Sequence, residues 1–277
     1  MEDPVTDTRD ELPREAGRTR PGALFEALTP PLAPERVLDA VPELGLARGV
    51  AQGDFHHLDA FGHILQTIRE VERELDERRL GALVPESRRD GLRLAGLLHD
   101  LAKPITRGEL EGRVLFVAHD TLGARYAHHV CRRLGVSAED TDLAVTLTAL
   151  HLKIGFMSNP RSDYPPERLV RAAGPFTQEL AVLSWADRLA ARGFRLKPEH
   201  VERHRELCET FLAESRVPDS REPQDYPGLA KRLGLSGAPE ADTGYAASHL
   251  RSLVARGLEE DEAAAQTETL LAGRISG

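Results

Sequence analysis

A His next to an Asp in an apolar stretch is the first sign of chemistry in this sequence. His99 and Asp100 follow a Leu-rich run, residues 92–98, and Pro104 comes soon after them. We predict one helix over residues 88–102, apolar on nearly every side and therefore buried, which Pro104 ends. A buried carboxylate is costly unless a positive charge or a metal ion lies against it. The doublet therefore indicates a divalent metal site.

Two other ionisable residues lie on predicted helices that could face this doublet. His63 flanks the apolar stripe of a helix predicted over residues 61–75, where it is either a surface residue or a ligand that reaches across to the doublet. Asp187 interrupts the apolar run of a helix predicted over residues 176–190. Like Asp100, it needs a partner if it is buried.

The ends of two further helices carry His residues. His119 and Asp120 form a second doublet, but Asp120 or the residue after it is expected to cap the helix that continues to residue 134. His151 ends a helix predicted over residues 137–151. Both His residues join the candidate set, because they lie in the chain between its other members.

The candidate ligands are a mixture of imidazoles and carboxylates. Such a set suits Mn, Fe, Co, Ni or Zn, and Mg where the ion keeps much of its water. His200 and His204 are also spaced to share one helix face. Glu and Arg residues surround them in the sequence, so we interpret that face as solvated rather than as a metal site.

The composition predicts a helical protein with a substantial core. Of the 277 residues, 40% are hydrophobic, and the mix is rich in Leu, Ala, Arg and Glu, which favour helix. Only two Cys residues are present, which argues against a disulfide framework and a Cys-based zinc site. No apolar run reaches the roughly 18 residues of a membrane span, and the polar, acidic N-terminus is unlike a signal peptide. We therefore expect a soluble, cytoplasmic protein.

The charge distribution bears on the kind of ligand. The net charge of −9 argues against a nucleic-acid footprint along the whole chain. Within residues 123–197, however, Lys and Arg outnumber Asp and Glu. A locally basic stretch suits a phosphorylated ligand, and a solvated helix surface of mixed charge explains it equally well.

The order and setting of four candidate residues resemble a known family. They are His63, the doublet His99-Asp100 in Leu-Leu-His-Asp-Leu-Ala-Lys-Pro, and Asp187 in Leu-Ser-Trp-Ala-Asp-Arg-Leu-Ala-Ala-Arg-Gly. The doublet alone is weak evidence, but all four in this order within a helical pattern resemble the HD superfamily of metal-dependent phosphohydrolases.

Three runs resemble one branch of that superfamily more closely. Residues 55–63, 117–124 and 186–193 are similar to the HD-containing C-terminal body of bacterial tRNA nucleotidyltransferases, the CCA-adding enzymes. The likeness extends over about residues 25–275 and weakens after residue 195. The nucleotidyltransferase head of that family, with its Gly-Ser and paired-Asp motifs, does not precede it here, so we expect no nucleotide addition from this chain.

The resemblance implies an all-α fold, an HD-domain helical bundle with a C-terminal helical extension. We expect an HD phosphohydrolase domain over residues 22–195 and a C-terminal helical region over residues 196–277. Residues 1–21 are polar and lack an apolar period, which is typical of a disordered tail.

For the site, the resemblance implies hydrolysis of a phosphate ester at a divalent metal ion, namely Mn, Ni, Co, Fe, Zn or Mg. His63, His99, Asp100 and Asp187 would hold the ion. Asp100 would also orient or deprotonate the attacking water.

Four further residues have implied roles around that ion. Lys103 would neutralise a phosphate oxygen, and Arg188 would do the same, although a structural ion pair explains Arg188 equally well. His119 and His151 would hold a second metal ion or bind phosphate. The resemblance thus implies one or two ions per chain.

Three hypotheses follow for the function. The first is a metal-dependent phosphohydrolase that acts on a nucleotide, a 2′,3′-cyclic phosphate or an RNA-end phosphate. The second is a non-catalytic module that binds tRNA or another RNA, or that works beside a separate nucleotidyltransferase protein. The third is purely structural, with the candidate His and Asp residues satisfied by hydrogen bonds and by salt bridges to Arg and Lys.

Overall fold

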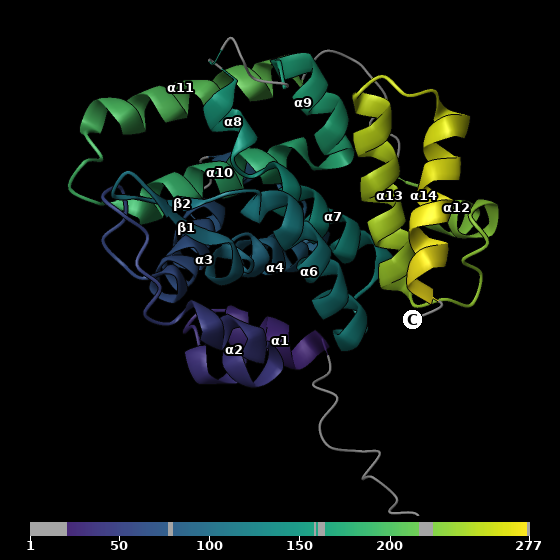
Figure 1. The fold of residues 1–277 in the computed structure, drawn as a ribbon, viewed down its shortest axis with the longest axis horizontal. Helices are drawn as coiled ribbons and strands as arrows, with labels where there is room; N and C mark the ends of the chain where they lie inside the picture. Colours follow the sequence, from purple (N-terminus) through teal and green to yellow (C-terminus); the bar gives the residue numbers. More distant parts are fainter. Residues whose placement is uncertain (1–20, 77–79, 158, 160–163, 216–223, 276–277) are drawn as a thin grey trace, which may run out of the picture.

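The described part of the chain is almost entirely helical. Helices surround a buried centre, and a single two-stranded sheet accompanies them (Figure 1), which confirms the all-α prediction. The predicted disordered tail, residues 1–21, lies outside the described residues except for Pro21, at which the first helix begins. The computed structural model describes residues 21–76, 80–157, 159, 164–215 and 224–275.

The elements follow one another with mostly short connections. The longer α-helices and the strands alternate with short helical turns, several of them 3-10 helices labelled η. In chain order the elements are α1 (Pro21–Leu28), α2 (Pro34–Ala40), η1 (Pro42–Ala47), α3 (Ala60–Asp76), η2 (Leu80–Leu83), η3 (Glu86–Arg88), α4 (Arg89–Leu98), α5 (Lys103–Thr106), β1 (Arg107–Leu110), β2 (Arg113–Phe116), α6 (His119–Leu134), α7 (Ala138–Leu150), α8 (Lys153–Phe156), α9 (Pro166–Ala173), η4 (Gly174–Phe176), α10 (Thr177–Ala191), α11 (Pro198–Glu214), α12 (Tyr226–Arg232), α13 (Glu240–Ala255) and α14 (Glu260–Ile275).

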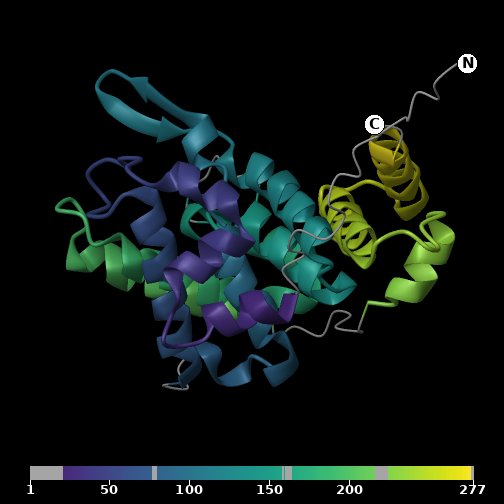
Figure 2. The same cartoon turned by 90° about the horizontal axis from the view of Figure 1, so that it is seen from below.

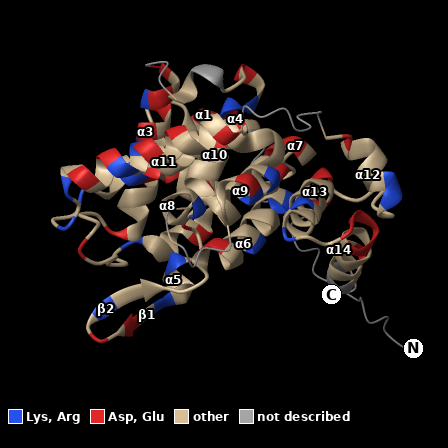
Figure 3. Cartoon of the chain, turned by 90° about the horizontal axis from the view of Figure 1, so that it is seen from above, with Lys and Arg blue, Asp and Glu red and all other residues tan. Residues whose placement is uncertain are grey.

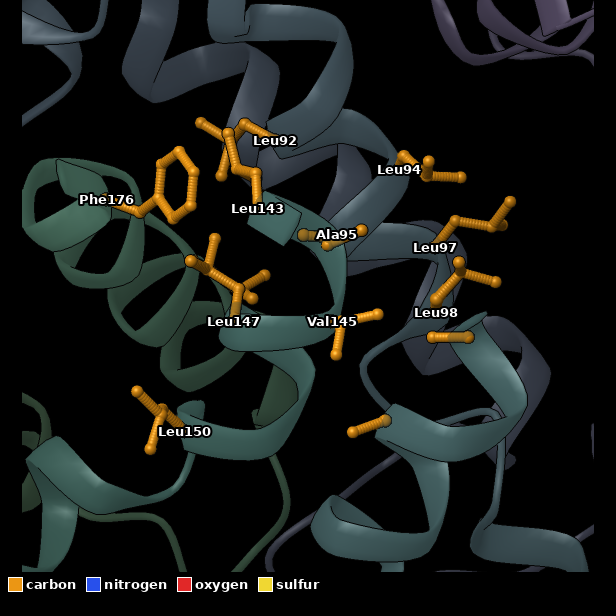
Figure 4. Packing of buried hydrophobic residues seen from close by; sticks show 14 of the residues in the cluster. Leu92, Leu94, Ala95, Leu97, Leu98, Leu143, Val145, Leu147, Leu150 and Phe176 are labelled. Carbon is orange, nitrogen blue, oxygen red and sulfur yellow. The ribbon is translucent and has the colours of Figure 1, made fainter. Parts of the chain in front are cut away.

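Helix α7 lies at the centre of the fold. Helices α4, α6 and α13 all pack against it. Leu143 and Leu147 of α7 are fully buried and lie in one cluster with Leu92 of α4 and Phe176 (Figure 4). Because neighbours cover α7 on several sides, its hydrophobic residues need not follow a single stripe.

Helices α3 and α10 pack against each other beside α4. The apolar stripe predicted for α3 is confirmed, because its residues are buried in this packing. A polar residue on the flank of such a helix can be buried too when a second helix covers that flank. This is the situation of His63, which is fully buried.

The C-terminal helices pack on the core through a buried ion pair. Arg251 of α13 donates to Asp142 of α7, with Nη2 and Oδ1 2.6 Å apart. Arg251 also donates to the Thr146 hydroxyl at 2.7 Å, and the Tyr226 hydroxyl donates to Asp142 at 3.0 Å. Removing one partner would leave a buried charge uncompensated, so this network helps to hold the extension on the core. The domain boundary at residues 195 and 196 stays a prediction.

A β-hairpin projects from the helical body (Figure 2). Its turn residues, Glu111 and Gly112, both have positive φ, 51° and 72°, as a type I′ turn requires. Arg107 pairs with Phe116 at the base of the hairpin. Residues 113–116 thus form one strand of the hairpin, and residues 107–110 form its partner.

The prediction of one helix over residues 88–102 is wrong at its C-terminal end. Helix α4 ends at Leu98, His99 is its C-cap, and Pro104 lies in the first turn of the separate helix α5. Pro is tolerated there because the first turn of a helix does not use its backbone N–H. The doublet therefore lies in the turn that joins two helices.

Five Lys and Arg residues of the basic stretch pair with acidic residues. Figure 3 shows positively and negatively charged residues interspersed over the visible face. Mixed charge therefore accounts for much of the local excess of Lys and Arg within residues 123–197. The pairs from this stretch include Arg132 with Asp242, Arg133 with Glu43, Lys153 with Asp120, Arg192 with Glu70 and Arg195 with Asp54.

None of the described helices is both long enough and apolar enough to pass through a lipid bilayer.

We expect the replacement Gly244→Ala to weaken the contact between α13 and α7. A Cβ at Gly244 would lie 2.2 Å from the carbonyl oxygen of Ala138, so the two helices would have to move apart. Overpacking of this kind costs about 1–3 kcal/mol, measurable as a lower free energy of unfolding in urea. Gly45→Ala is the control, since its Cβ would meet nothing within 4 Å. Equal stability of the two variants would contradict this account.

Candidate metal centre

Three elements bring the first group of candidate ligands together. His63 comes from α3, His99 from the turn after α4, and Asp187 from α10. His63 Nε2 lies 2.8 Å from Asp187 Oδ1, and the ligand atoms of all three residues lie within 4.8 Å of one another. His63 and His99 are fully buried, whereas the Asp187 side chain is 22% exposed and so less buried than the sequence indicated.

A second group lies on the other side of Asp100. Its members are Asp100, His119 at the start of α6 and His151 just after α7, again with ligand atoms within 4.8 Å of one another. Asp100 Oδ1 lies 3.3 Å from His119 Nε2 and 3.7 Å from His151 Nε2. Its other oxygen, Oδ2, lies 3.1 Å from His99 Nε2 and 3.5 Å from His63 Nε2. Asp100 therefore presents one carboxylate oxygen to each group.

Backbone carbonyls orient three of the imidazoles in the same way. The Nδ1 atoms of His99, His119 and His151 lie 2.7–2.8 Å from the carbonyl oxygens of the residues three positions earlier. A carbonyl only accepts, so each Nδ1 carries the proton and, in the neutral ring, each Nε2 keeps a lone pair. This arrangement typically fixes the tautomer of a metal-binding His.

The electrostatics of the centre favour a positively charged ligand. Burial lowers the pKa of His63, and lowers that of His151 to about 3, so both rings are neutral at pH 7. Burial also opposes charge on His99, but the carboxylates of Asp100 and Asp187 outweigh it and raise that pKa. Although burial alone would raise the pKa of both carboxyls, His99 holds that of Asp100 well below its usual value, and His63 does so for Asp187. The two carboxylates thus face neutral rings at His63 and His151.

The hydrogen-bond pattern of the centre fits a divalent metal ion. Asp100 is 1% exposed. Lys103 Nζ lies 2.6 Å from its Oδ2, but Oδ1 is buried without a hydrogen-bond partner. The Nε2 atoms of His99 and His119 are likewise buried without one. Buried polar atoms rarely remain unpartnered, and these are the atoms that metal ions bind. The donor set suits the mixed-ligand ions expected from the sequence.

A cavity of about 300 Å³ opens onto both groups. Lys103 lines it, with Nζ 2.6 Å from Asp100 Oδ2, and donates to Gln52 Oε1 at 2.5 Å. Arg188 lines it from α10, and the Nε of this residue is buried without a hydrogen-bond partner. Strand β2 forms part of the wall through Phe116. The cavity, hereafter the metal-site cavity, can therefore surround an anionic group with positive charge.

Two distant segments pair to position the start of α3 and the end of α10. The His57 N–H donates to the Ala191 carbonyl at 3.1 Å, and the Gly193 N–H donates to the Phe55 carbonyl at 2.8 Å. A Cβ at Gly193 would lie only 2.2 Å from the Phe55 carbonyl carbon, so Gly allows this close approach. The pairing helps to fix His63 relative to Asp187.

His56 is a residue of the site that the sequence analysis did not select. Its ring lies edge-on to that of His63, with 4.8 Å between centroids, and lines the metal-site cavity. Burial lowers its pKa to about 3, so the ring is neutral at pH 7. The sequence did hold one signal for His56, because it lies in the run 55–63 that carries the family resemblance. It was not selected because it lies outside the predicted helices.

The two residues of the second doublet, His119 and Asp120, have different roles. Helix α6 begins at His119 and not after Asp120, so the expected cap is wrong. The Asp120 carboxylate instead pairs with Lys153 at 2.7 Å. Asp120 therefore has a structural partner, while His119 faces Asp100.

His200 and His204 do not share a solvated face. His200 is exposed, but His204 is buried, and its Nε2 lies 3.0 Å from both Oγ and the carbonyl oxygen of Ser184. The interpretation of a solvated pair is therefore wrong for His204, because α11 packs its inner face on α10. Neither residue belongs to a group of potential metal ligands among the described residues.

Comparison with known proteins identifies the region that carries this centre. The HD domain family matches residues 55–192, which begin and end on the two paired segments. The chain is 34% identical over 155 residues to the A-adding tRNA nucleotidyltransferase of Deinococcus radiodurans, covering 55% of this chain and 32% of that protein. It is 29% identical over 203 residues to the CC-adding tRNA nucleotidyltransferase of Thermus thermophilus, covering 72% of this chain and 42% of that protein.

A third relative is the multifunctional CCA protein of Cupriavidus taiwanensis. Here the identity is 34% over 143 residues, which is 51% of this chain and 30% of the relative. The chain thus spans less than half the length of each of these curated relatives.

We expect His204 to make the stability of the protein depend on pH. Burial, aided by Arg188, lowers its pKa in the folded protein to about 4 from 6.5. The unfolded chain therefore binds a proton first as the pH falls, and up to about 3 kcal/mol of stability is lost between pH 6.5 and pH 4. Urea denaturation across this range should show a smaller loss for His204→Gln than for the wild type.

His200→Gln is the matched control for that experiment. It lies on the same helix, but its side chain is exposed, so the variant should keep the wild-type pH dependence. An unchanged slope in His204→Gln would contradict the assignment.

Proposed function

Because the chain belongs to the HD domain family and is homologous there to the HD region of CCA-adding tRNA nucleotidyltransferases, we propose that it is a metal-dependent phosphohydrolase. Its substrate is a nucleotide, a 2′,3′-cyclic phosphate or an RNA-end phosphate ester. One observation carries the proposal: a buried carboxylate, Asp100, presents each of its two oxygens to a different group of imidazoles.

The residues present account for two divalent ions. His63, His99, Asp187 and one oxygen of Asp100 would hold the first, and the other oxygen of Asp100 with His119 and His151 would hold the second. Such ions polarise a phosphoryl oxygen and lower the pKa of bound water toward neutrality.

The chain's own residues supply orientation and charge. Asp100 accepts a hydrogen bond from the attacking water and aligns it with the phosphorus atom. Lys103, fixed by Gln52, neutralises developing negative charge on the phosphoryl oxygens. Arg188 lines the same cavity and anchors the phosphate or its neighbour.

The choice of substrate rests on the relatives. The matched proteins are named for adding nucleotides to tRNA, and an RNA end with a terminal phosphate is the corresponding substrate for a hydrolase. The same relatives suggest two partners for this chain, namely tRNA and a separate nucleotidyltransferase protein. The alternative, a non-catalytic RNA-binding or partner module, gains no specific support from the metal centre.

The structural hypothesis meets a specific difficulty. It requires the candidate His and Asp residues to be satisfied by hydrogen bonds and salt bridges. Lys103 pairs with Oδ2 of Asp100, but Oδ1 and the Nε2 atoms of His99 and His119 lack hydrogen-bond partners. Leaving such atoms buried costs about 1–3 kcal/mol each, which bound ions would offset.

Asp100→Asn should remove both the bound metal and the hydrolytic activity. The measurement is elemental analysis of gently purified protein, together with a screen of phosphomonoesters and 2′,3′-cyclic nucleotides in Mn, Ni, Co or Mg. We expect a loss of about 10²–10⁴-fold in turnover, the usual worth of general acid–base groups.

Asp242→Asn is the matched control. Asp242 also forms a buried pair with a His, His128 at 2.8 Å, but it lies outside both ligand groups, so metal content and turnover should persist. Turnover retained in Asp100→Asn would remove this residue from the mechanism. No metal and no turnover in the wild type would favour the RNA-binding module, and tRNA binding would be measured next.

His119→Ala should lower the metal content from about two ions to about one per chain. The first group keeps all its members in this variant, because His119 contributes only to the second. His99→Ala should instead deplete the first group. Elemental analysis after dialysis distinguishes these outcomes, and an unchanged metal content in His119→Ala would argue against a second ion.

A further inference from the structure

A second cavity adjoins the metal-site cavity. It has a volume of about 360 Å³, and Phe55 and Arg188 line both cavities. Its other walls come from Gly155, His200, Arg203, His204 and Leu207. None of these residues carries a carboxylate, so the lining is aromatic, apolar and basic. We call this second space the aromatic pocket.

One exposed Phe residue lines this pocket, and a second follows one of its lining residues in the chain. All eight Phe residues of the chain are described, and three of them are exposed: Phe55 at 45%, Phe156 at 47% and Phe194 at 81%. Phe55 lines the pocket and Phe156 follows the lining residue Gly155, whereas Phe194 lines neither cavity. Exposed aromatic rings gathered at a cavity are typical of a ligand site.

The backbone that carries Phe55 is held in place by its neighbours. The segment around it pairs with residues 191–195 through the Gly193 N–H and through the Arg195 N–H, which donates to the Asp54 carbonyl at 3.2 Å. The Asp54 carboxylate also pairs with Arg195 at 3.0 Å. A backbone segment fixed before binding loses little conformational freedom when a ligand binds to its side chain.

Two imidazoles complete the aromatic walls. The His200 ring lies 6.3 Å from that of Phe55 and is tilted by 49°, so the two rings border the pocket without stacking on each other. His204 is buried, and burial lowers its pKa to about 4. At pH 7 it therefore adds a neutral, flat wall.

We propose that the aromatic pocket binds the nucleobase of a substrate whose phosphate ester lies in the metal-site cavity. The base stacks on Phe55, because every nucleobase offers a π-face to an aromatic ring. The His200 ring, tilted by 49° to that of Phe55, contacts the edge of the base. Arg188, which lines both cavities, lies between base and phosphate and contacts the anionic linkage. This inference rests on the proposed hydrolysis and narrows its substrate to nucleoside phosphates and RNA ends, as against phosphate esters without a base.

The kinetic test compares two substrates that differ only in the base. The full chain in Mn²⁺ is assayed with adenosine 5′-monophosphate and with ribose 5-phosphate. We expect kcat/KM to be roughly tenfold or more higher for the nucleotide, as stacking of one base on an aromatic ring allows. Phe55→Ala and His200→Ala should bring this ratio close to one, and Phe55→Tyr should restore it.

Phe194→Ala is the matched control, because this exposed Phe lines neither cavity and its loss should leave the ratio unchanged. A ratio near one in the wild type, or an undiminished ratio in both Phe55→Ala and His200→Ala, would overturn the inference. Circular dichroism confirms that each variant is folded.

A binding measurement separates this inference from the proposed hydrolysis. Adenosine has no phosphate to release, so calorimetric titration of the wild type with adenosine and with ribose needs no turnover. Binding of adenosine but not ribose, lost in Phe55→Ala, would support the pocket even if no phosphate ester were hydrolysed. Hydrolysis without adenosine binding and without a nucleotide preference would retain the enzyme and reject the pocket.

Discussion

A single buried carboxylate governs the arrangement of this protein. Asp100 is almost fully enclosed, and its negative charge can be tolerated only where positive charge or metal ligation compensates it. Lys103 supplies one charge, and four imidazoles converge on the carboxylate from α3, α6 and the ends of α4 and α7. The central helices must therefore be arranged so that their His residues lie around Asp100.

That geometry depends on interactions far from the ligands themselves. The pairing of residues 54–57 with residues 191–195 fixes the start of the site to its end, across most of the HD domain. On the opposite side of α7, the buried pair of Asp142 and Arg251 holds α13 on the core. Both devices act on helices that carry or adjoin ligands, which keeps the site on rigid elements rather than on free loops.

The same paired segments give the site a second function in our proposal. They place Phe55 between the metal-site cavity and the aromatic pocket, and Arg188 follows the ligand Asp187 in α10. The same short segments of backbone can thus align the metal ligands and carry the residues that recognise the substrate. Recognition of a base and hydrolysis of its phosphate would then be coupled by position alone.

The sequence by itself determined the helical class, the stripe of α3 and the identity of the ligand candidates, because these follow from periodicity and from the cost of burying charge. It could not place the end of α4: the apolar run continues through Leu101, but the chain turns at His99 so that the doublet meets ligands from α3, α6, α10 and the end of α7. Tertiary packing likewise decided that His204 is buried and that Asp120 belongs to Lys153. The local sequence shows which residues are able to form hydrogen bonds or bind a metal ion. Which of these interactions form depends on the neighbours that cover each helix face. For His63, that neighbour is Asp187, more than a hundred residues away in the chain.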